Sequence, residues 1–500
     1  MAGGDEEGEI RKNLIENNHI DAIIGLPANI FFGTGIPTII MVLRQKRENT
    51  DVLIIDASKG FIKEGKNNKL RASDIKRIAD TFIKRESVPK FSRVVSREEI
   101  RSNDYNLNIP RYVDSSEAAE HWDVYASMFG GIPTAEIEEL GEFWTAFPAL
   151  KKALFTESGI PYVNVSVDDI KSAIKSHPDV VGFEDAFNAA FSTFPAFLKE
   201  ELIDRMESIE ISKAETVLSA DIFERLKDIP LIDKYAAFQL LDDDWTGISI
   251  DLEVLQTEGF SATKEVDPNL VIKKKDGKDQ EVQEGWVGHI IPFDLVQATL
   301  LSAETDELHG LESRLAEIPS EYESILDEMT EEDKESCNDV LTEEGDAFVP
   351  KEVSKKIKEL KKDRSPESVA LRTLLEKVES LIKSEKEIKA EIKAKSAALQ
   401  AKTKDTIESL SDEQALDLLE KKWIAPLIES IHKLPDTVID SLVSKIQALQ
   451  NKYATTFFEV EQQISETEAT LSGMIEDLEG NEYDMLGLNE LKKLLGGSAE

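Results

Sequence analysis

The segment 242–253 carries acidic side chains at the spacing of a calcium-binding loop. Loop positions 1, 3, 6 and 12 are taken by Asp242, Asp244, Gly247 and Glu253. Position 5 departs from the pattern, because it holds Thr246 in place of aspartate or asparagine. We therefore predict that this segment is not a calcium site.

Patterns for other metal sites and for nucleophilic catalysis are missing from the sequence. The single cysteine, Cys337, has no second thiol with which to form an intramolecular disulfide. No Gly-x-Ser-x-Gly turn marks a hydrolytic serine. The histidines are never spaced like metal ligands, and they are His19, His121, His177, His289, His309 and His432. We predict no metal site and no hydrolase chemistry.

Charge is distributed unevenly along the chain. The 500 residues carry 59 basic and 99 acidic side chains, a formal net charge of -40, which excludes a protein that binds nucleic acid over most of its surface. Residues 1–114 nevertheless hold 19 basic and 17 acidic side chains. A basic run in this part predicts contacts with phosphate, and the candidates are Lys63, Lys66, Lys69 and Arg71. The alternative is a solvated face without a ligand.

Short apolar runs in the first 114 residues have the length and composition of buried strands. The runs 20–26, 36–43 and 52–55 are rich in β-branched residues and are bounded by glycine, proline or aspartate. Residues 9–17 and 71–85 instead place apolar side chains at helical spacing. The predicted order is helix, strand, strand, strand, helix, which is typical of the end of an α/β domain.

Three strands that are buried on both faces need neighbours on both edges and helices on both faces. No strand–helix unit precedes residue 9. We therefore expect the domain to begin partway through a larger sheet, or its first strand to be completed by another molecule. On this expectation the strand 20–26 is an open edge, which would also allow self-association.

Four strings of the N-terminal region resemble one enzyme family. They are IRKNLIENNHIDAIIGLPANIFFGTGIPTIIMVLRQKR, VLIIDASKGF, NNKLRASDIKRIADTF and SNDYNLNIPRYVD. In this order they look like the methylation subunit of type I restriction-modification systems, an adenine-N6 DNA methyltransferase. The later stretches 121–133, 235–255 and 285–301 are similar to the C-terminal region of the larger members.

The resemblance implies a specific place in the family's architecture. In the family these strings follow the catalytic loop and form the last strands of an S-adenosylmethionine-dependent methyltransferase sheet. The complete subunit would methylate adenine N6 together with a specificity subunit and, in the full complex, a restriction subunit. DNA would be bound through that complex. We therefore expect this chain to be the C-terminal portion of such a subunit, serving mainly in its assembly.

The motifs that carry the family's chemistry are not in this sequence. The cofactor turn of Phe-x-Gly-x-Gly type and the Asn-Pro-Pro-aromatic motif are both absent, and the nearest approximations are the segments 128–131 and 267–269. We predict no catalytic residue, no bound S-adenosylmethionine and no activity for the chain alone. The resemblance also implies an aromatic that stacks on the extruded adenine, for which the candidates are Phe31 and Phe32. The alternative is that these two rings simply cap the core.

The last third of the chain has a helical pattern with a long apolar stripe. Helices are predicted over 365–407, 415–434 and 435–471, and the two long ones would form an antiparallel hairpin. The resemblance implies that these helices bind the helical spacers of the specificity subunit. The partner-binding candidates are Leu442, Ile446, Leu449 and Tyr453. The alternative is an intramolecular coiled coil that has no partner.

These patterns divide the chain into four regions. They are the end of a methyltransferase domain (1–114), an acidic, mainly helical domain (115–300), an acidic helical connector (301–364) and a long helical arm (365–500). The expected fold class is an α/β remnant followed by a mainly α region with a long C-terminal helical hairpin. No stretch is apolar enough to span a bilayer and no leader pattern begins the chain, so we expect a cytoplasmic location and no membrane partner.

A function from a different class is also consistent with the sequence. Residues 115–500 carry 40 basic and 82 acidic side chains. Such a body could belong to a non-enzymatic acidic coiled-coil protein that acts as a scaffold or as a DNA mimic. A DNA mimic would bind a DNA-handling enzyme without any specificity subunit, whereas a methylation subunit would need one.

Overall fold

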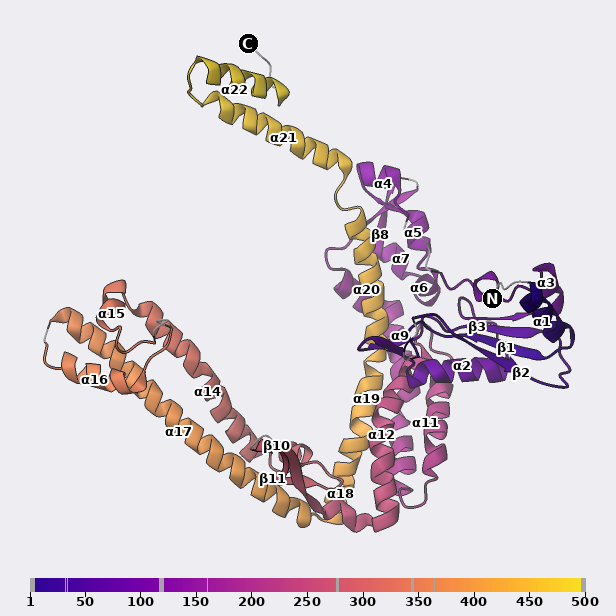
Figure 1. Cartoon of the computed structure of the whole chain (residues 1–500), viewed down its shortest axis with the longest axis horizontal. Coiled ribbons are helices and arrows are strands. Elements are labelled where there is room, and N and C mark those ends of the chain that lie inside the picture. The colour runs from indigo at the N-terminus through magenta and orange to yellow at the C-terminus, as the bar shows by residue number, and fades with distance from the viewer. Residues whose placement is uncertain are drawn as a thin grey trace. The chain divides into compact units, whose positions relative to one another are not determined.

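A computed structural model of the chain describes residues 5–31, 33, 35–116, 121–159, 161–275, 278–342, 346–363 and 365–495 (Figure 1). Most of these residues are helical, and strands form only small sheets. The chain divides into two compact units. Unit 1 contains Met1–Phe197, Ser212–Thr246 and Leu427–Glu500, and unit 2 contains Leu198–Ile211 and Gly247–Pro426. Among the described residues, no helix combines the length and the apolarity that crossing a bilayer requires.

A four-stranded sheet forms the centre of the N-terminal region of unit 1. Its strands are β1 (Ile20–Gly25), β2 (Ile39–Leu43), β3 (Val52–Asp56) and β6 (Ser92–Val95), in the spatial order β2-β1-β3-β6. β1 and β3 are parallel, whereas β2 and β6 run antiparallel to their neighbours. The three runs predicted as strands are therefore strands in the structure.

Alternate residues of β1 and β3 pack into two separate apolar clusters. Ile23 and Ile54 lie in one cluster with Ile15 of α1 (Asp5–Glu16). Leu53, one position along, lies in the other cluster with Phe82 of α2 (Ala72–Lys84). Because successive side chains of a strand point to opposite faces, α1 and α2 cover opposite faces of the sheet. The helices predicted over 9–17 and 71–85 thus supply the cover that these strands need.

The edge strands of the described sheet are β2 and β6, and β2 is the more exposed of the two, so the expectation that the strand 20–26 is an open edge was wrong. β1 is fully buried and pairs with β2 on one side and β3 on the other. Within the described sheet β2 pairs only with β1, although all five of its residues, IIMVL, are apolar. Its Ile39, Ile40 and Leu43 are 40, 47 and 55% exposed. The cause is topological, since the second predicted strand folds back antiparallel to the first and lies outermost.

The helical part of unit 1 packs around α20 (Leu434–Lys452). Leu442 and Ile446 of α20 are buried in a cluster with Phe147, Ile174 and Phe183. The other elements of unit 1 are, in chain order, β4 (Ile62–Glu64), β5 (Asn67–Lys69), α3 (Arg97–Ser102), a 3-10 turn (Ile109–Arg111), α4 (Val124–Phe129), β7 (Ile132–Pro133), α5 (Thr134–Glu138), α6 (Gly141–Ala146), α7 (Leu150–Leu154), β8 (Phe155–Gly159), β9 (Tyr162–Val165), α8 (Ile170–Lys175), α9 (Pro178–Phe191), α10 (Phe194–Leu198), α11 (Ile211–Leu226), α21 (Phe457–Glu476) and α22 (Glu482–Leu494). Among the described helices, four have residues in both units: α12 (Lys234–Glu258), α19 (Ala425–His432), and also α10 and α11, whose Leu198 and Ile211 belong to unit 2.

Unit 2 contains two long antiparallel helices, α14 (Ser302–Glu328) and α17 (Pro366–Glu408), that run side by side (Figure 1). Glu304 of α14 pairs with Lys402 near one end of the pair, and Glu328 pairs with Lys377 near the other. The connecting helices α15 (Glu331–Ser336) and α16 (Pro350–Leu360) lie between α14 and α17 in the sequence. Side chains from α14, α16 and α17 share one apolar cluster.

The helical hairpin predicted between 365–407 and 435–471 is not confirmed. The antiparallel partner of α17 is α14, whose acidic residues match the lysines of α17. An apolar stripe specifies that a helix packs on something, and it does not specify on which helix. The predicted boundary at residue 300 also lies inside unit 2, whose long segment begins at Gly247.

The remaining elements of unit 2 include a two-stranded hairpin. Its strands are β10 (Val266–Lys275) and β11 (Lys278–Gly288), which pair antiparallel. The others are a π-helical segment (Lys199–Asp204), a 3-10 turn (Phe260–Lys264), α13 (Phe293–Thr299), α18 (Asp412–Leu419) and a second π-helical segment (Glu420–Ile424). The calcium-like segment 242–253 lies within α12, so its backbone is helical and does not form a cation-binding loop.

Candidate nucleic-acid interface

The carboxyl ends of β1 and β3 meet at one edge of the sheet, because the two strands are parallel. In open α/β sheets this is the edge that contacts ligands. β1 continues there into the loop 26–38, and β3 is followed by the hairpin β4–β5. The loop carries Phe31 and the hairpin carries Lys63, Lys66 and Lys69, so two groups of predicted site residues follow the same edge.

Asn68 joins the hairpin to the loop. Its side-chain amide donates a hydrogen bond to the carbonyl oxygen of Ala28 at 2.7 Å, and its backbone N–H donates to the carbonyl oxygen of Asn29 at 2.9 Å. Asn29 adopts the left-handed conformation, with φ of 55°, which turns the chain toward Phe31. The hairpin that carries the lysines and the backbone just before Phe31 are therefore held together. Nothing in the sequence around Asn68 reveals a partner 40 residues away, so this link is not predictable from the sequence.

Phe31 is exposed, and this argues against the alternative that its ring caps the core. Its side chain is 55% exposed. A large apolar ring at the surface, two residues after the backbone that Asn68 holds, is available for stacking on a ligand. Phe32, the second candidate, lies outside the described residues.

The four basic candidates differ in their availability. Lys63 and Lys66 are exposed, and neither has an ion-pair partner in the part of the chain that the structure describes. Lys69 pairs with Glu64 at 3.2 Å. Arg71 makes two hydrogen bonds to the Asp74 carboxylate, at 3.0 and 3.1 Å, and these raise the pKa of the guanidinium. Lys63 and Lys66 are thus the side chains that a phosphate would meet without competition.

Other cations of the basic run have structural partners. Lys76 lies over the ring of Phe238 at 5.3 Å from its centroid, and Arg77 lies over Phe91 at 4.5 Å. Arg85 donates to the buried carboxylate of Asp21 at 2.7 Å. These contacts account for part of the charge that the sequence concentrates between 59 and 111, and that part is not free to bind DNA.

Asp56, at the end of β3, has its carboxylate engaged within the fold. It accepts hydrogen bonds from the Ser115 hydroxyl and from the backbone N–H of Ser58, the latter at 3.0 Å. Its side chain is buried. The carboxylate therefore fixes the turn after the strand, and the geometry gives it no role as a free base.

The nearest approximation to a cofactor turn does not fit S-adenosylmethionine. Gly130 and Gly131 both have positive φ, of 85° and 89°, as a glycine turn requires. A side-chain carbon added at Gly130 would lie 3.3 Å from Thr456, and one added at Gly131 would lie 3.2 Å from Tyr162. The space beside these glycines is filled by the protein's own side chains, so the residues present do not form a cradle for the cofactor.

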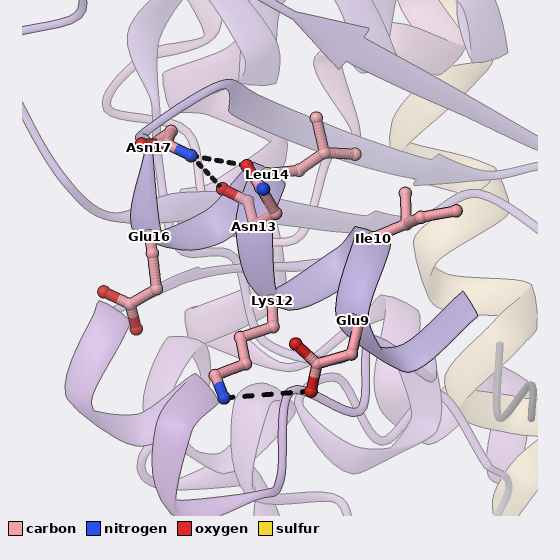
Figure 2. A pocket seen from close by; sticks show the side chains of 7 residues that line it. All are labelled: Glu9, Ile10, Lys12, Asn13, Leu14, Glu16 and Asn17. Atoms are coloured by element: carbon pink, nitrogen blue, oxygen red, sulfur yellow. Dashed lines mark hydrogen bonds and ion pairs between the residues drawn. The ribbon is translucent and has the colours of Figure 1, made fainter. Parts of the chain in front are cut away.

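A surface hollow along α1 is lined by Glu9, Ile10, Lys12, Asn13, Leu14, Glu16 and Asn17 (Figure 2). Its polar groups are already paired. Asn17 donates to the carbonyl oxygen of Asn13 at 3.0 Å, and Lys12 pairs with Glu9 at 3.8 Å. Hydrogen bonds from Arg101 and then from Tyr105 lower the pKa of Glu16 to about 2. The hollow is therefore the outer surface of a helix rather than a ligand site.

The predicted partner-binding residues lie inside unit 1. Leu442, Ile446 and Tyr453 are buried in the core around α20, and Leu449 packs against the same cluster. The Tyr453 hydroxyl also accepts a hydrogen bond from the backbone N–H of Asp123 at 3.1 Å. These side chains are covered by the chain itself.

Comparison with known proteins bears on the N-terminal region. Residues 1–121 match the family N-6 DNA Methylase. This part of the chain is similar to type I methylation subunits. It is 38% identical over 120 residues to the type I restriction enzyme MpnII methylase subunit of Mycoplasma pneumoniae. It is 37% identical over 147 residues to the type I restriction enzyme MjaVII methylase subunit of Methanocaldococcus jannaschii.

The relationship to type I methylation subunits covers a limited part of each protein. The two alignments include 24% and 28% of this chain and 22% and 26% of the relatives, so the chain spans about a quarter of their length. A solved methyltransferase subunit of a type I restriction-modification system, from Streptococcus thermophilus, is 51% identical over 23% of this chain and 24% of its own, with a TM-score of 0.23. The resemblance seen in the four N-terminal strings is confirmed.

Proposed function

We propose that this chain is the portion of a type I methylation subunit that follows the catalytic motifs. On this proposal the sheet β2-β1-β3-β6 is the last part of the methyltransferase sheet, and the complete subunit transfers a methyl group from S-adenosylmethionine to adenine N6. Specificity and restriction subunits complete the assembly that binds DNA. The observation that carries the proposal is the fixed arrangement of Phe31 and the hairpin lysines at the carboxyl edge of β1 and β3.

The chemistry proposed for this chain is contact with an extruded adenine and its flanking phosphates. Phe31 would stack on the base, and Lys63 and Lys66 would neutralise phosphates next to it. Stacking on an aromatic ring contributes about 1–3 kcal/mol per base. The methyl donor would be held by the rest of the complete subunit, because the space beside Gly130 and Gly131, the nearest approximation to its turn, is filled by Thr456 and Tyr162. The chain alone is expected to bind no S-adenosylmethionine and to be inactive.

The open edge of the sheet supports a further strand alongside β2. The apolar side chains of β2 point to both faces of the sheet, as in a strand with neighbours on both sides. An exposed apolar edge is a hazard that proteins cover. The strand that covers it in the complete subunit would come from the region that binds the cofactor.

Reconstitution tests this function. The chain is combined with a polypeptide that carries the Asn-Pro-Pro-aromatic motif of a type I methylation subunit and with the specificity subunit, and methyl transfer to DNA is measured. Activity is expected only when all three are present, and Phe31→Ala should lower it by about ten-fold or more. Activity that does not respond to Phe31→Ala removes the proposed stacking role.

Salt dependence tests the lysine contacts. Lys63→Gln with Lys66→Gln should weaken DNA binding by the assembly and reduce the slope of log K against log salt by about 2, about 1 for each lysine. The matched control is Lys386→Gln with Lys393→Gln, two exposed lysines of α17. If both pairs of substitutions weaken DNA binding equally, the loss comes from the change in overall charge and not from a phosphate site at Lys63 and Lys66.

The second candidate function is an acidic scaffold or DNA mimic, favoured by the 40 basic and 82 acidic side chains of residues 115–500. Such a protein would bind a DNA-handling enzyme in the absence of any specificity subunit, and the binding would weaken with salt. Binding that needs the specificity subunit, together with methylation in the reconstituted assembly, would exclude it.

A further inference from the structure

Exposed lysines form a row along the outer face of α16 and the turn that follows it. The members of this lysine row are Lys351, Lys355, Lys358 and Lys362. Their spacings of four, three and four residues keep them within an arc of about 60° around the helix axis. The helical turn continues to Lys362, whose backbone N–H donates to the carbonyl oxygen of Glu359 at 3.1 Å. The lysine row is therefore straight and about 16 Å long.

The opposite face of α16 is buried, which fixes the direction of the lysine row. Val353 and Ile357 are 0 and 2% exposed in the apolar cluster that α16 shares with α14 and α17. Lys356, beside the cluster, donates to the backbone carbonyl of Ser336. These contacts prevent the helix from rotating about its axis. The lysine row consequently faces solvent.

Helix stability does not account for the whole lysine row. Lys358 lies in the last turn of α16, where the helix dipole favours a cation. Lys351 lies in the first turn, directly after Pro350, where the same dipole disfavours one. A lysine at the unfavourable end, in line with the others, is consistent with a ligand that meets the full length of the row.

Most of the lysine row is free of competing carboxylates. Lys355 pairs with Glu352 at 3.2 Å, and the other three lysines have no ion-pair partner in the part of the chain that the structure describes. Residues 350–362 hold six lysines and two glutamates, whereas residues 301–349 hold 2 basic and 17 acidic side chains. α16 is thus a positively charged surface within a strongly acidic part of unit 2.

The chemistry of the lysine row suits a chain of phosphates. One strand of duplex DNA carries a phosphate about every 3.4 Å along the helix axis, so about 16 Å of lysines spans about five phosphates. The row has no aromatic, arginine, asparagine or glutamine side chain, the types that typically stack on bases or read their edges. Its contact with DNA would be electrostatic and independent of base sequence.

We infer that α16 binds the sugar–phosphate backbone of duplex DNA, as a second contact separate from the one proposed at Phe31. The lysine row belongs to unit 2, whereas Phe31, Lys63 and Lys66 belong to unit 1. The acidic side chains around α16 repel phosphate, so the contact in unit 2 is confined to the row. The inference rests on the proposed function only in that the complete assembly would bring duplex DNA to this chain.

DNA binding by the full chain tests the lysine row without the proposed assembly. The background carries Lys63→Gln with Lys66→Gln, which removes the lysines of the hairpin from the measurement. Fluorescence anisotropy with a labelled duplex of about 20 base pairs and arbitrary sequence should show binding at low salt that weakens as salt is raised. Specificity subunit, methyl donor and a second polypeptide are all left out, so a failure to reconstitute methylation would not affect this result.

Matched lysine pairs identify the binding face. Lys351→Gln with Lys358→Gln should weaken binding by about ten-fold at low salt and reduce the slope of log K against log salt by about 2. Lys386→Gln with Lys393→Gln removes two exposed lysines of α17 that are also seven residues apart, and it should change binding far less. All four positions are exposed, so circular dichroism should show the same helix content in both variants.

Crosslinking locates the DNA independently of affinity. The single cysteine, Cys337, is buried, so an added surface cysteine can be labelled selectively with an aryl azide. Glu359→Cys, next to the lysine row, should crosslink the duplex on illumination. Glu408→Cys, near the other end of α17, makes the same change of charge and should not.

Three outcomes would overturn the inference. The first is that the duplex does not bind, and the second is that the two lysine pairs weaken binding equally or that both cysteines crosslink equally. The third is that a polyglutamate peptide of the same charge competes as well as unlabelled duplex, since the lysine row would then be a surface for acidic protein segments and not for nucleic acid.

Discussion

The side-chain amide of Asn68 donates a hydrogen bond to the carbonyl oxygen of Ala28 at 2.7 Å. This bond joins a hairpin whose exposed lysines suit phosphate to a loop whose exposed phenylalanine suits a base. Neither element is long enough to be rigid alone, since β4 and β5 have three residues each. Asn68 is therefore a positioning residue for both groups.

Replacing Asn68 tests this coupling. Asn68→Ala removes the bond to Ala28 and should cost about 1 kcal/mol of local stability, because the carbonyl then exchanges a protein partner for water. Hydrogen exchange of the amides between 26 and 38 should accelerate by about five-fold. Asn67→Ala is the control, since it changes the neighbouring asparagine of the same strand, and it should leave the exchange of the loop unchanged. Equal acceleration in both variants would mean that the hairpin fold, and not Asn68, orders the loop.

Asp251 of α12 is the acceptor at a buried junction of unit 2. Its carboxylate accepts from the indole N–H of Trp423 at 2.8 Å and from the ammonium group of Lys422. Asp251→Ala leaves a buried indole and a lysine without that acceptor and should lower the free energy of unfolding by about 3 kcal/mol. Glu253→Ala, an exposed acid in the same helix, should change it by less than about 0.5 kcal/mol. Chemical denaturation of both variants, followed by tryptophan fluorescence, measures the difference.

His289 makes the stability of unit 2 depend on pH. Its imidazole is hydrogen-bonded to Asp267 at 2.6 Å and lies 3.2 Å from Glu258, and these carboxylates raise the pKa of the imidazole above the ordinary value of 6.5. Because the folded pKa exceeds the unfolded one, the stabilisation is complete below about pH 6.5 and is lost as the pH rises through the folded pKa. His289→Gln should flatten this part of the profile in thermal unfolding between pH 5.5 and 8.5. His309→Gln, at an exposed position of α14, serves as the control. If His309→Gln flattens the pH profile as much as His289→Gln does, His289 is not the source of the pH dependence.

Gly288 is required by a close backbone approach at the end of β11. A side-chain carbon there would lie 1.7 Å from the carbonyl oxygen of Ile291, a distance that only a backbone shift relieves. Gly288→Ala should destabilise unit 2 by about 2 kcal/mol or more. Gly310→Ala provides a contrast of opposite sign, because Gly310 lies within α14 with open space around it, and alanine should stabilise the helix there by about 0.5–1 kcal/mol. Thermal denaturation of the two variants measures whether Gly288→Ala lowers the stability and Gly310→Ala raises it.

Local signals in the sequence predicted the elements, and they did not predict which elements meet. The helix predicted over 365–407 is α17, which Ser365 caps by accepting a hydrogen bond from the backbone N–H of Ser368, with Pro366 as its first residue. The apolar runs predicted β1, β2 and β3, because the apolar pattern of a buried strand is a local feature of the sequence. Their spatial order depends on long-range pairing, so the position of β2 at the edge was not predictable from the runs alone.

The stripe from Leu442 to Leu471 shows the same limit. The sequence predicts one continuous apolar stripe, whereas the structure divides it into a buried part on α20 and an exposed part on α21. A sequence signal for the break was present, because Thr456 and Glu459 form a capping box that starts a new helix. The exposure of Phe31 and its link to the lysine hairpin had no comparable signal, since both depend on a contact between residues 28 and 68.

The open edge at β2 gives the last prediction, which concerns self-association. Ile40 and Leu43 are 47 and 55% exposed on a strand whose outer side has no described neighbour. Such an edge pairs with other chains, and lysine on an edge strand prevents this because a charge cannot be buried in the new interface. Ile40→Lys with Leu43→Lys should therefore shift the isolated chain from associated species to monomer in sedimentation velocity at tens of micromolar. Ile75→Lys with Ile83→Lys places the same charges on exposed positions of α2 and should leave the distribution unchanged. A wild-type chain that sediments as a monomer at every concentration would show that the β2 edge does not pair with other chains.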